Sequence, residues 1–328
     1  MIAITGASGL LGSFITQRLL EGRASVVGLK RPNSNMTLVR EFENQIQWIE
    51  GDVTDPHSLD HAFQGVNTVV HSAGLVSFNP RKSKELFQIN TEGTRHVVNA
   101  CLKAGVPNLV FVSSVAALGR QKDVHHITEE SRWVEGPMNS DYAKSKYLAE
   151  LEVFRGQEEG LNVAMVNPSV ILAPGDWNRS SAQLFKYVWN ERKFYTNGNL
   201  NFVDVRDVAE AIWKLSQRKL TGDRYIINGG YDTFSNVFLK VAHRFNKKSP
   251  FIKVNRSLAG LAATIEEVQS YIFQYEPVIT RQSVKMTKGE FYYNNKKSID
   301  TLQLSYKSLE ETLDWCCAVF LERYNINK

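Results

Sequence analysis

The chain begins Met1-Ile2-Ala3-Ile4-Thr5-Gly6-Ala7-Ser8-Gly9-Leu10-Leu11-Gly12, a short apolar run that leads into three glycines. This order predicts a strand over residues 2–5, and the apolar spacing behind it predicts a helix over residues 11–21. Such a turn presents backbone N–H groups and a helix N-terminus to a pyrophosphate. Gly6 allows the tight turn, Gly9 lets a phosphate approach the backbone, and Gly12 lets the helix pack on the strand. The stretch predicts a dinucleotide site, with a purely structural glycine turn as the alternative.

The composition is typical of a globular protein in a reducing compartment. The chain has 328 residues, of which 43% are hydrophobic, so we expect one large or two modest domains. The net charge of +5 is scattered, which argues against a nucleic-acid partner. No apolar run is long enough to span a bilayer, and Met1 leads directly into the first strand, so we expect no membrane partner and no cleavable leader. Because Cys101, Cys316 and Cys317 lack metal-ligand spacing, we expect free thiols, no metal and a cytoplasmic location.

Strand and helix patterns alternate through the first two thirds of the chain. The strand-like runs are almost continuously apolar and therefore predict a parallel sheet that helices cover on both faces. Right-handed crossovers then give an α/β fold with a doubly wound parallel sheet, a Rossmann fold. The predicted strands span residues 2–5, 25–29, 46–50, 68–72, 109–113, 163–167, 201–203 and 225–227. The predicted helices span residues 11–21, 58–63, 86–104, 140–159 and 208–217.

The pattern changes after residue 228, where helical spacing dominates. Helices are predicted at 234–245, 258–273 and 309–324, with one short strand at 251–254. Together with an aromatic and basic stretch before residue 199, they indicate a smaller lobe over the carboxyl ends of the strands, where ligands bind in such folds. We therefore predict a dinucleotide-binding Rossmann domain from residues 1–170 plus 200–230. A mostly helical substrate-binding lobe would comprise residues 171–199 plus 231–328.

The end of the second predicted strand bears on the choice of cofactor. Its sequence is Lys30-Arg31-Pro32, whereas an NAD site usually has an acidic residue here that binds the ribose 2′-hydroxyl. Lys30 and Arg31 are instead suited to a 2′-phosphate, because a guanidinium matches phosphate geometry. The stretch favours NADP(H) over NAD(H), with solvent-facing loop charges as the alternative.

Two further strand ends carry residues suited to a cofactor. Asp52 could accept a hydrogen bond from the adenine amino group, although an Asx turn or N-cap explains it equally well. The small residues Ser72, Ala73 and Gly74 allow the backbone to run close to the cofactor's ribose and phosphates. We expect His71, beside them, to be a packed strand histidine.

The sequence also places a hydroxyl, a phenol and an ammonium where they can converge. Ser114 follows the fifth strand, and Tyr142 and Lys146 lie four residues apart on one face of a predicted helix. We expect the Lys146 ammonium to lower the pKa of the Tyr142 phenol by favouring the phenolate. A tyrosine tuned in this way can exchange a proton near neutral pH, while Ser114 holds the substrate oxygen.

Taken together, these motifs resemble those of the extended short-chain dehydrogenase/reductase family, also called the NAD-dependent epimerase/dehydratase family. The resemblance covers residues 1–230 closely and the remainder loosely. The motifs that carry it are Thr5-Gly6-Ala7-Ser8-Gly9-Leu10-Leu11-Gly12, Gly51-Asp52-Val53, His71-Ser72-Ala73-Gly74, Asn90-Thr91-Glu92-Gly93-Thr94, Ser113-Ser114 and Tyr142 with Lys146.

The resemblance implies a role for each matched residue. Tyr142 would be the general acid/base, Lys146 would lower its pKa and hold the nicotinamide ribose, and Ser114 would orient the substrate carbonyl. Phe78 and Trp177 would shape the substrate pocket, with surface packing as the equal alternative. The implied cofactor-binding residues are Gly6, Ser8, Gly9, Leu10, Leu11, Gly12, Lys30, Arg31, Asp52, Val53, Ser72, Ala73, Gly74, Asn90, Asn167, Pro168 and Ser169.

Within the family, the chain most resembles the dihydroflavonol-reductase-like branch. The residues concerned are the stretches at 112–119 and 166–171 and the Lys30-Arg31-Pro32 ending. This branch implies NADP-dependent reduction of a ketone or aldehyde, or the reverse oxidation, on a fairly apolar small molecule. The alternatives are an NAD-dependent sugar-nucleotide epimerase with tightly bound cofactor and a non-catalytic cofactor-binding regulator. The family's four-helix contact would make a homodimer from the helices at 86–104 and 140–159.

Two departures weigh against a sugar-nucleotide substrate. Dehydratases of the family carry an Asp-Glu pair after the serine or threonine, whereas Val115-Ala116 stand here. Epimerases usually place an arginine where Leu200 stands, because the substrate's diphosphate needs cationic partners. Arg179, Arg192 or Lys193 could compensate, so the epimerase alternative stays open.

Overall fold

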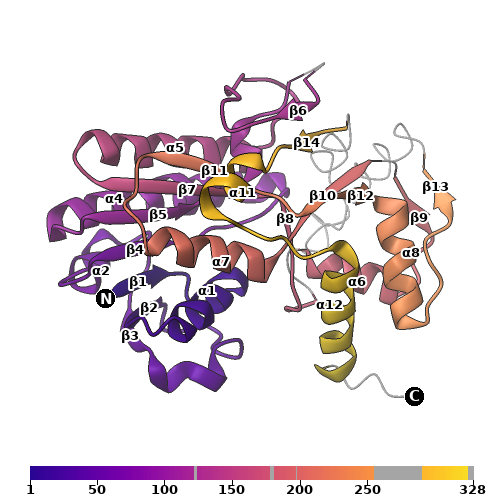
Figure 1. The fold of residues 1–328 in the computed structure, drawn as a ribbon, viewed down its shortest axis with the longest axis horizontal. Coiled ribbons are helices and arrows are strands. Elements are labelled where there is room, and N and C mark those ends of the chain that lie inside the picture. Colours follow the sequence, from indigo (N-terminus) through magenta and orange to yellow (C-terminus); the bar gives the residue numbers. More distant parts are fainter. Residues whose placement is uncertain (122–123, 178–180, 197, 255–289, 324–328) are drawn as a thin grey trace.

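The structure is a computed structural model, and its centre is a seven-stranded, wholly parallel sheet, as predicted (Figure 1). It describes residues 1–121, 124–177, 181–196, 198–254 and 290–323. In sheet order the strands are β11 (Asp223–Ile227), β7 (Asn162–Pro168), β5 (Asn108–Val112), β4 (Thr68–His71), β1 (Ile2–Thr5), β2 (Val26–Lys30) and β3 (Gln47–Glu50). The strand order reverses between β1 and β4, and ligands of doubly wound sheets bind at such a switch point.

Helices cover both faces of this sheet. One apolar cluster includes Ile4 and Val70 and lies under α1 (Leu10–Glu21), α7 (Val205–Ser216) and α11 (Lys296–Leu302). A second cluster includes Ala3 and Val69 and lies under α2 (Pro56–Ala62), α4 (Gly93–Ala104) and α5 (Asp141–Glu158). Successive residues of one strand thus feed opposite clusters, which explains why β1 and β4 are apolar at consecutive positions. Figure 1 shows α4 and α5 on one side of the sheet and α1 and α7 on the other.

The helix predicted at residues 86–104 is not continuous. It consists of α3 (Ser83–Leu86), a π-helical segment η3 (Phe87–Glu92) and α4. Within η3, Asn90 turns its side chain to the backbone of Leu75, with which it exchanges two hydrogen bonds. This tertiary contact lies within the π-helical segment, and π-helical turns are frequent at functional sites.

The lobe beyond the sheet has an apolar core of its own. It is formed by α6 (Ala182–Trp189), α8 (Phe234–Phe245) and α12 (Leu309–Arg323), which gather at one end of the molecule in Figure 1. Rings of Trp177, Phe185, Phe245 and Phe320 contact one another in this core. The helix predicted at 258–273 lies outside the described residues. The two-domain division stays a prediction; Leu302, which it assigns to the lobe, packs in the cluster beneath the sheet.

Several short elements lie outside this sheet; the predicted strands at 201–203 and 251–254 are among them, and the others were not predicted. A three-stranded sheet joins β8 (Val170–Leu172), β10 (Asn199–Asp204) and β12 (Gly230–Thr233), and two pairs join β9 (Phe194–Tyr195) with β13 (Ile252–Lys253) and β6 (His126–Ile127) with β14 (Tyr292–Tyr293). Single 3₁₀ turns occur at η1 (Arg40–Gln45), η2 (Pro80–Lys82) and η4 (Val115–Leu118). In the described part of the chain, no helix combines the length and apolar character needed to cross a bilayer.

Candidate active site

The turn between β1 and α1 leaves a helix N-terminus open. Helix α1 begins at Leu10 with Gly9 as its N-cap, no side chain caps this end, and the first turn has no acidic residue. The first backbone N–H groups therefore lack a side-chain acceptor, and their partial positive charge favours an anion. A dinucleotide pyrophosphate fits this end of the helix.

Two of the three glycines are also required by the packing of the turn. Gly6 has a φ of +73°, and a Cβ there would lie 2.9 Å from the backbone of Ala73. A Cβ on Gly12 would lie 2.0 Å from the carbonyl oxygen of Gly6. Gly9 is exposed, and Ser8, Leu10 and Leu11 around it are half-buried. Packing within the turn is enough to explain why Gly6 and Gly12 are glycines, without a bound dinucleotide. The exposed Gly9, by contrast, keeps the helix end accessible.

A buried chain of hydrogen bonds connects this turn to η3. His71 Nδ1 lies 2.7 Å from Thr5 Oγ1, and His71 Nε2 lies 3.0 Å from Thr94 Oγ1. Thr94 Oγ1 in turn donates to the carbonyl oxygen of Asn90. Burial lowers the pKa of His71 to about 3, so the ring is neutral at physiological pH. His71 is a packed strand histidine, as predicted.

This histidine should make the fold sensitive to acid. We expect the free energy of unfolding to be highest above about pH 6.5 and to decrease below it. The reason is that His71 of the unfolded chain binds a proton below about pH 6.5, whereas folded His71 binds one only near pH 3. Urea midpoints at pH 7.5 and 5.5 check this. His71→Gln should show a smaller fall between the two pH values than the wild type, whereas His57→Gln, at an exposed position, should match the wild type. If the urea midpoint decreased equally in the wild type and in His71→Gln, the acid sensitivity would not come from His71.

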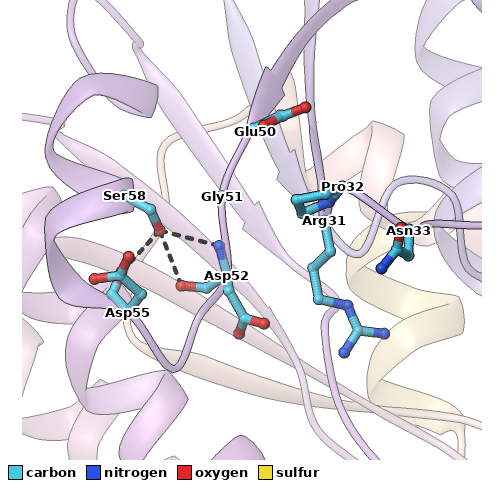
Figure 2. Close-up of a pocket in the computed structure, with 8 residues that line it drawn as sticks. All are labelled: Arg31, Pro32, Asn33, Glu50, Gly51, Asp52, Asp55 and Ser58. Carbon is cyan, nitrogen blue, oxygen red and sulfur yellow. Dashed lines mark hydrogen bonds between the residues drawn. The ribbon is translucent and has the colours of Figure 1, made fainter.

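A cleft of about 600 Å³ lies at the carboxyl ends of β2 and β3. Figure 2 shows the guanidinium of Arg31 pointing into the space beside Asp52. Asp52 Oδ1 accepts from the backbone N–H of Thr54 at 2.9 Å, so the Asx turn is present although the carboxylate also lines the cleft. The ammonium of Lys30 lies over the ring of Trp48, 5.9 Å from its centroid. The cleft is lined by Arg31, Pro32, Asn33, Glu50, Gly51, Asp52, Asp55 and Ser58.

Ser114, Tyr142 and Lys146 meet at the carboxyl end of β5. Ser114 is the N-cap of η4, where its hydroxyl accepts from the N–H of Ala116 at 3.2 Å and lies close enough to the Tyr142 phenol to oppose the rise in its pKa. Helix α5 carries Tyr142 and Lys146, which are 9% and 5% exposed. Lys146 Nζ donates to the carbonyl oxygen of Val112 at 2.8 Å. The structure therefore brings together the hydroxyl, phenol and ammonium that the sequence singled out.

The pKa of Tyr142 shifts in the direction opposite to the prediction. Burial raises the pKa of the phenol, and the hydrogen bond from Ser114 only partly opposes this effect. The expected lowering by Lys146 was wrong for this structure, because burial of the phenol has the larger effect. Burial also lowers the pKa of Lys146 to about 8, against the opposing charge of Glu150.

Gly74 and Asn90 lie on the β4 side of Lys146. A Cβ on Gly74 would lie 3.3 Å from both Asn90 Oδ1 and Lys146 Nζ. The Asn90 amide accepts from the N–H of Leu75 at 2.8 Å and donates to the Leu75 carbonyl and to Ser145 Oγ, each at 2.9 Å. Asn90 thus holds the segment after β4, and its contact with a cofactor ribose stays a prediction.

The carboxyl end of β7 offers buried polar atoms to a ligand. Within the described residues, Asn167 Oδ1 and Ser169 Oγ are buried and have no hydrogen-bond partner. Buried polar groups are normally paired, so orphaned acceptors beside Pro168 fit the polar groups of a bound nicotinamide.

Near the third strand, Val53 packs against Gly93, where a Cβ would lie 2.9 Å from Val53 Cγ2.

The two predicted substrate residues have different surroundings. Phe78 lies edge-on to Tyr142, with ring centroids 6.0 Å apart. Trp177 is 6% exposed, and its ring packs on Trp189, Phe245 and Phe320 in the lobe core. The packing of the lobe therefore accounts for Trp177, whereas Phe78 adjoins the phenol.

The positions that weigh against a sugar nucleotide are apolar in the structure. Leu200 is 4% exposed within the lobe core, and Val115 is 8% exposed. Arg192 and Lys193 are exposed beside β9. Arg179 lies outside the described residues.

One residue of this site was missed from the sequence. Glu150 is 1% exposed and accepts hydrogen bonds from Ser113 and Asn167, at the ends of two strands. Its position four residues after Lys146 was the available signal, since residues so spaced share one helix face.

Comparison with known proteins agrees with this geometry. A model of the NAD dependent epimerase/dehydratase family matches residues 2–228. The chain is 28% identical to the putative dihydroflavonol 4-reductase of Synechocystis sp., over 94% of this chain and 91% of that protein. It is 30% identical to cinnamoyl-CoA reductase 1 of Oryza sativa subsp. japonica, over 70% and 71% of the two chains. The crystal structure of gox2253 superimposes with a TM-score of 0.84 at 28% identity, covering 100% of this chain and 99% of that one. The chain therefore belongs to the NAD-dependent epimerase/dehydratase family of extended short-chain dehydrogenases/reductases and is an NAD(P)-dependent enzyme of the oxidoreductase type.

Proposed function

We propose that the protein reduces a ketone or aldehyde on a fairly apolar small molecule with NADPH, or catalyses the reverse oxidation. The observation that carries the proposal is the placement of the Ser114 hydroxyl, the Tyr142 phenol and the buried Lys146 side chain together at the carboxyl end of β5. These groups lie at the carboxyl end of β5, which neighbours β4 and so lies next to the switch point between β4 and β1. The open N-terminus of α1 follows β1 at that switch point. The reductase names of two relatives add support for this reaction class.

Each of the three groups has a distinct role in the proposed reaction. The bound dinucleotide supplies the hydride donor. Tyr142 donates its hydroxyl proton to the substrate oxygen, and its raised pKa keeps that proton in place at neutral pH until the oxygen becomes basic. The Ser114 hydroxyl holds the same oxygen, and the positive charge of Lys146 stabilises the phenolate left behind.

The apolar character of the substrate is inferred from Phe78, which adjoins the phenol, and from two exposed apolar side chains on the segments that follow β4 and β7. Phe78 contacts Tyr142, and Val76 on the same segment is 52% exposed. Val170, which follows the carboxyl end of β7, is 40% exposed. Exposed apolar side chains around a polar centre are typical of sites for small apolar ligands.

A panel of carbonyl compounds, followed by the absorbance of NADPH, tests the proposal. We expect NADPH consumption with aromatic or alicyclic ketones and aldehydes and none with a nucleotide sugar. The epimerase alternative predicts cofactor that copurifies and resists dialysis, together with turnover of a nucleotide sugar. The regulator alternative predicts cofactor binding without turnover of any panel member. Either of these results would replace the proposed reaction.

Arg31 should set the preference for NADPH. Replacing it with serine removes a charge-assisted partner of the 2′-phosphate, which is worth about 1.5–3 kcal/mol, so the Kd for NADPH should rise by about 10–100-fold. The Kd for NADH should barely change, because NADH lacks this phosphate. Fluorescence titration of both cofactors measures the difference. Arg40→Ser, at an exposed position in η1, serves as control. Tighter binding of NADH than of NADPH by the wild type would contradict the NADP assignment.

A further inference from the structure

Glu150 joins three neighbouring strands to helix α5. Its Oε1 accepts from Ser113 Oγ at 2.5 Å and from Asn167 Nδ2 at 2.6 Å. Its Oε2 lies 3.3 Å from the NH1 group of Arg224. These three partners come from the ends or edges of β5, β7 and β11, which are adjacent in the sheet. A buried carboxylate is tolerated only when it is paired and hydrogen-bonded in this way.

Asn167 extends this contact to the reacting groups. Its Nδ2 donates to Glu150 and also to the carbonyl oxygen of Ser114, at 3.0 Å. The Ser114 hydroxyl in turn lies close enough to Tyr142 to act on the pKa of the phenol. A shift of the Glu150 carboxylate would therefore move Asn167 and, through it, the backbone that carries the Ser114 hydroxyl.

Glu150 is also the acidic group that acts on Lys146. This ammonium donates to the carbonyl oxygen of Val112 on β5 and lies 4.8 Å from the centroid of the Phe111 ring. The titratable groups that it interacts with are Glu150 on α5 and the neutral ring of His71 on β4. Arg224 on β11 pairs with Glu150. Burial lowers the pKa of Lys146 to about 8, and the negative charge of Glu150 raises it. Loss of that charge would favour the neutral amine.

We propose that Glu150 is a positioning residue of the active site. Its carboxylate fixes the ends of β5 and β7, and its negative charge acts on Lys146, which lies four residues before it on the same face of α5. The consequence for catalysis rests on the proposed function, whereas the effect on Lys146 does not.

The substitution Glu150→Gln removes the negative charge of the side chain and keeps its size and shape. The glutamine oxygen can still accept from Ser113 and Asn167, while the negative charge is gone. We expect kcat/KM to decline at a lower pH than in the wild type, so that the variant loses about tenfold more activity than the wild type between pH 6.5 and 8. Glu152→Gln, which alters a partly exposed partner of Arg155 on the same helix, should keep the wild-type profile.

Replacing Arg224 should have the opposite effect on the pH profile. Arg224→Met removes the positive charge beside Glu150, so the uncompensated carboxylate should hold the Lys146 proton to higher pH. If Glu150 had only a structural role, Glu150→Gln and Arg224→Met would shift the pH profile of kcat/KM in the same direction or not at all. Opposite shifts in Glu150→Gln and Arg224→Met support the inference, and any other pair of shifts contradicts it.

A direct titration of Lys146 makes the result independent of turnover. In protein labelled with ¹³C at lysine Cε, the Lys146 signal can be assigned by its loss in Lys146→Arg and followed against pH. We expect the titration midpoint to lie lower in Glu150→Gln than in the wild type. If no carbonyl compound is reduced but the midpoint moves as expected, the proposed function fails and the charge effect of Glu150 stands. If the wild type reduces carbonyl compounds and the midpoint does not move, the inference about Glu150 is wrong.

Discussion

Tyr142→Phe should bind the cofactor with unchanged affinity and lose carbonyl reduction by about 10²–10⁴-fold, the usual contribution of a positioned general acid. The ring would remain in place, because its contact with Phe78 needs no hydroxyl. What disappears is the proton that the proposed reaction delivers to the substrate oxygen. The measurements are single-turnover rates with saturating NADPH and a cofactor titration on the same preparation.

Tyr147→Phe is the matched control for this experiment. Tyr147 lies on the same helix, and its ring stacks on Trp133 with centroids 4.6 Å apart, so the substitution removes a phenol hydroxyl outside the site. We expect wild-type rates from it. Rapid turnover by Tyr142→Phe would assign the proton transfer to another group and overturn the proposed role.

Gly12→Ala should destabilise the turn and with it the cofactor site. The new Cβ would lie 2.0 Å from the carbonyl oxygen of Gly6 and 2.8 Å from its carbonyl carbon, and neither backbone atom can rotate away. Overpacking of this kind costs about 1–3 kcal/mol and more at rigid positions, so we expect a cost of about 3 kcal/mol and NADPH binding weakened at least about tenfold. Chemical denaturation and cofactor titration measure the two effects.

Gly136→Ala provides the comparison. No atom lies within 4 Å of a Cβ built on Gly136, so the same substitution there should leave stability and cofactor binding unchanged. Wild-type stability and NADPH affinity in Gly12→Ala would mean that α1 can move away from β1. The glycine at position 12 would then not be needed for the close approach of helix and strand.

The central sheet could be predicted because its signals are local. The glycine turn identifies β1 and α1, and strands buried on both faces are apolar without interruption. The π-helical segment could not be predicted, because it carries no sequence period of its own, and the contact that Asn90 makes with Leu75 within it is tertiary. Short strands such as β8 and β9 pair with distant segments and carry little periodic signal of their own.

The same limit applies to the site. The sequence spacing of Tyr142 and Lys146 predicted that they share a helix face, and their convergence with Ser114 is observed. The direction of the Tyr142 pKa shift was missed because burial is a property of the tertiary structure. Glu150 was missed for a related reason, since its partners come from strand ends far apart in the sequence. The catalytic roles, the NADP preference and the homodimer remain predictions.

The separate apolar core of the lobe has a consequence for how such enzymes diversify. Rings of Phe185, Phe245 and Phe320 support the lobe without taking part in the clusters beneath the sheet. Substitutions at distant, non-contacting positions contribute almost independently to stability. Apart from the edge-on contact between Phe14 of α1 and Trp315 of α12, mutations within the lobe core are therefore separated from the strands that carry the proton-transfer groups. An ancestral scaffold of this kind can acquire new substrates by successive changes in one half while the reaction chemistry is inherited intact.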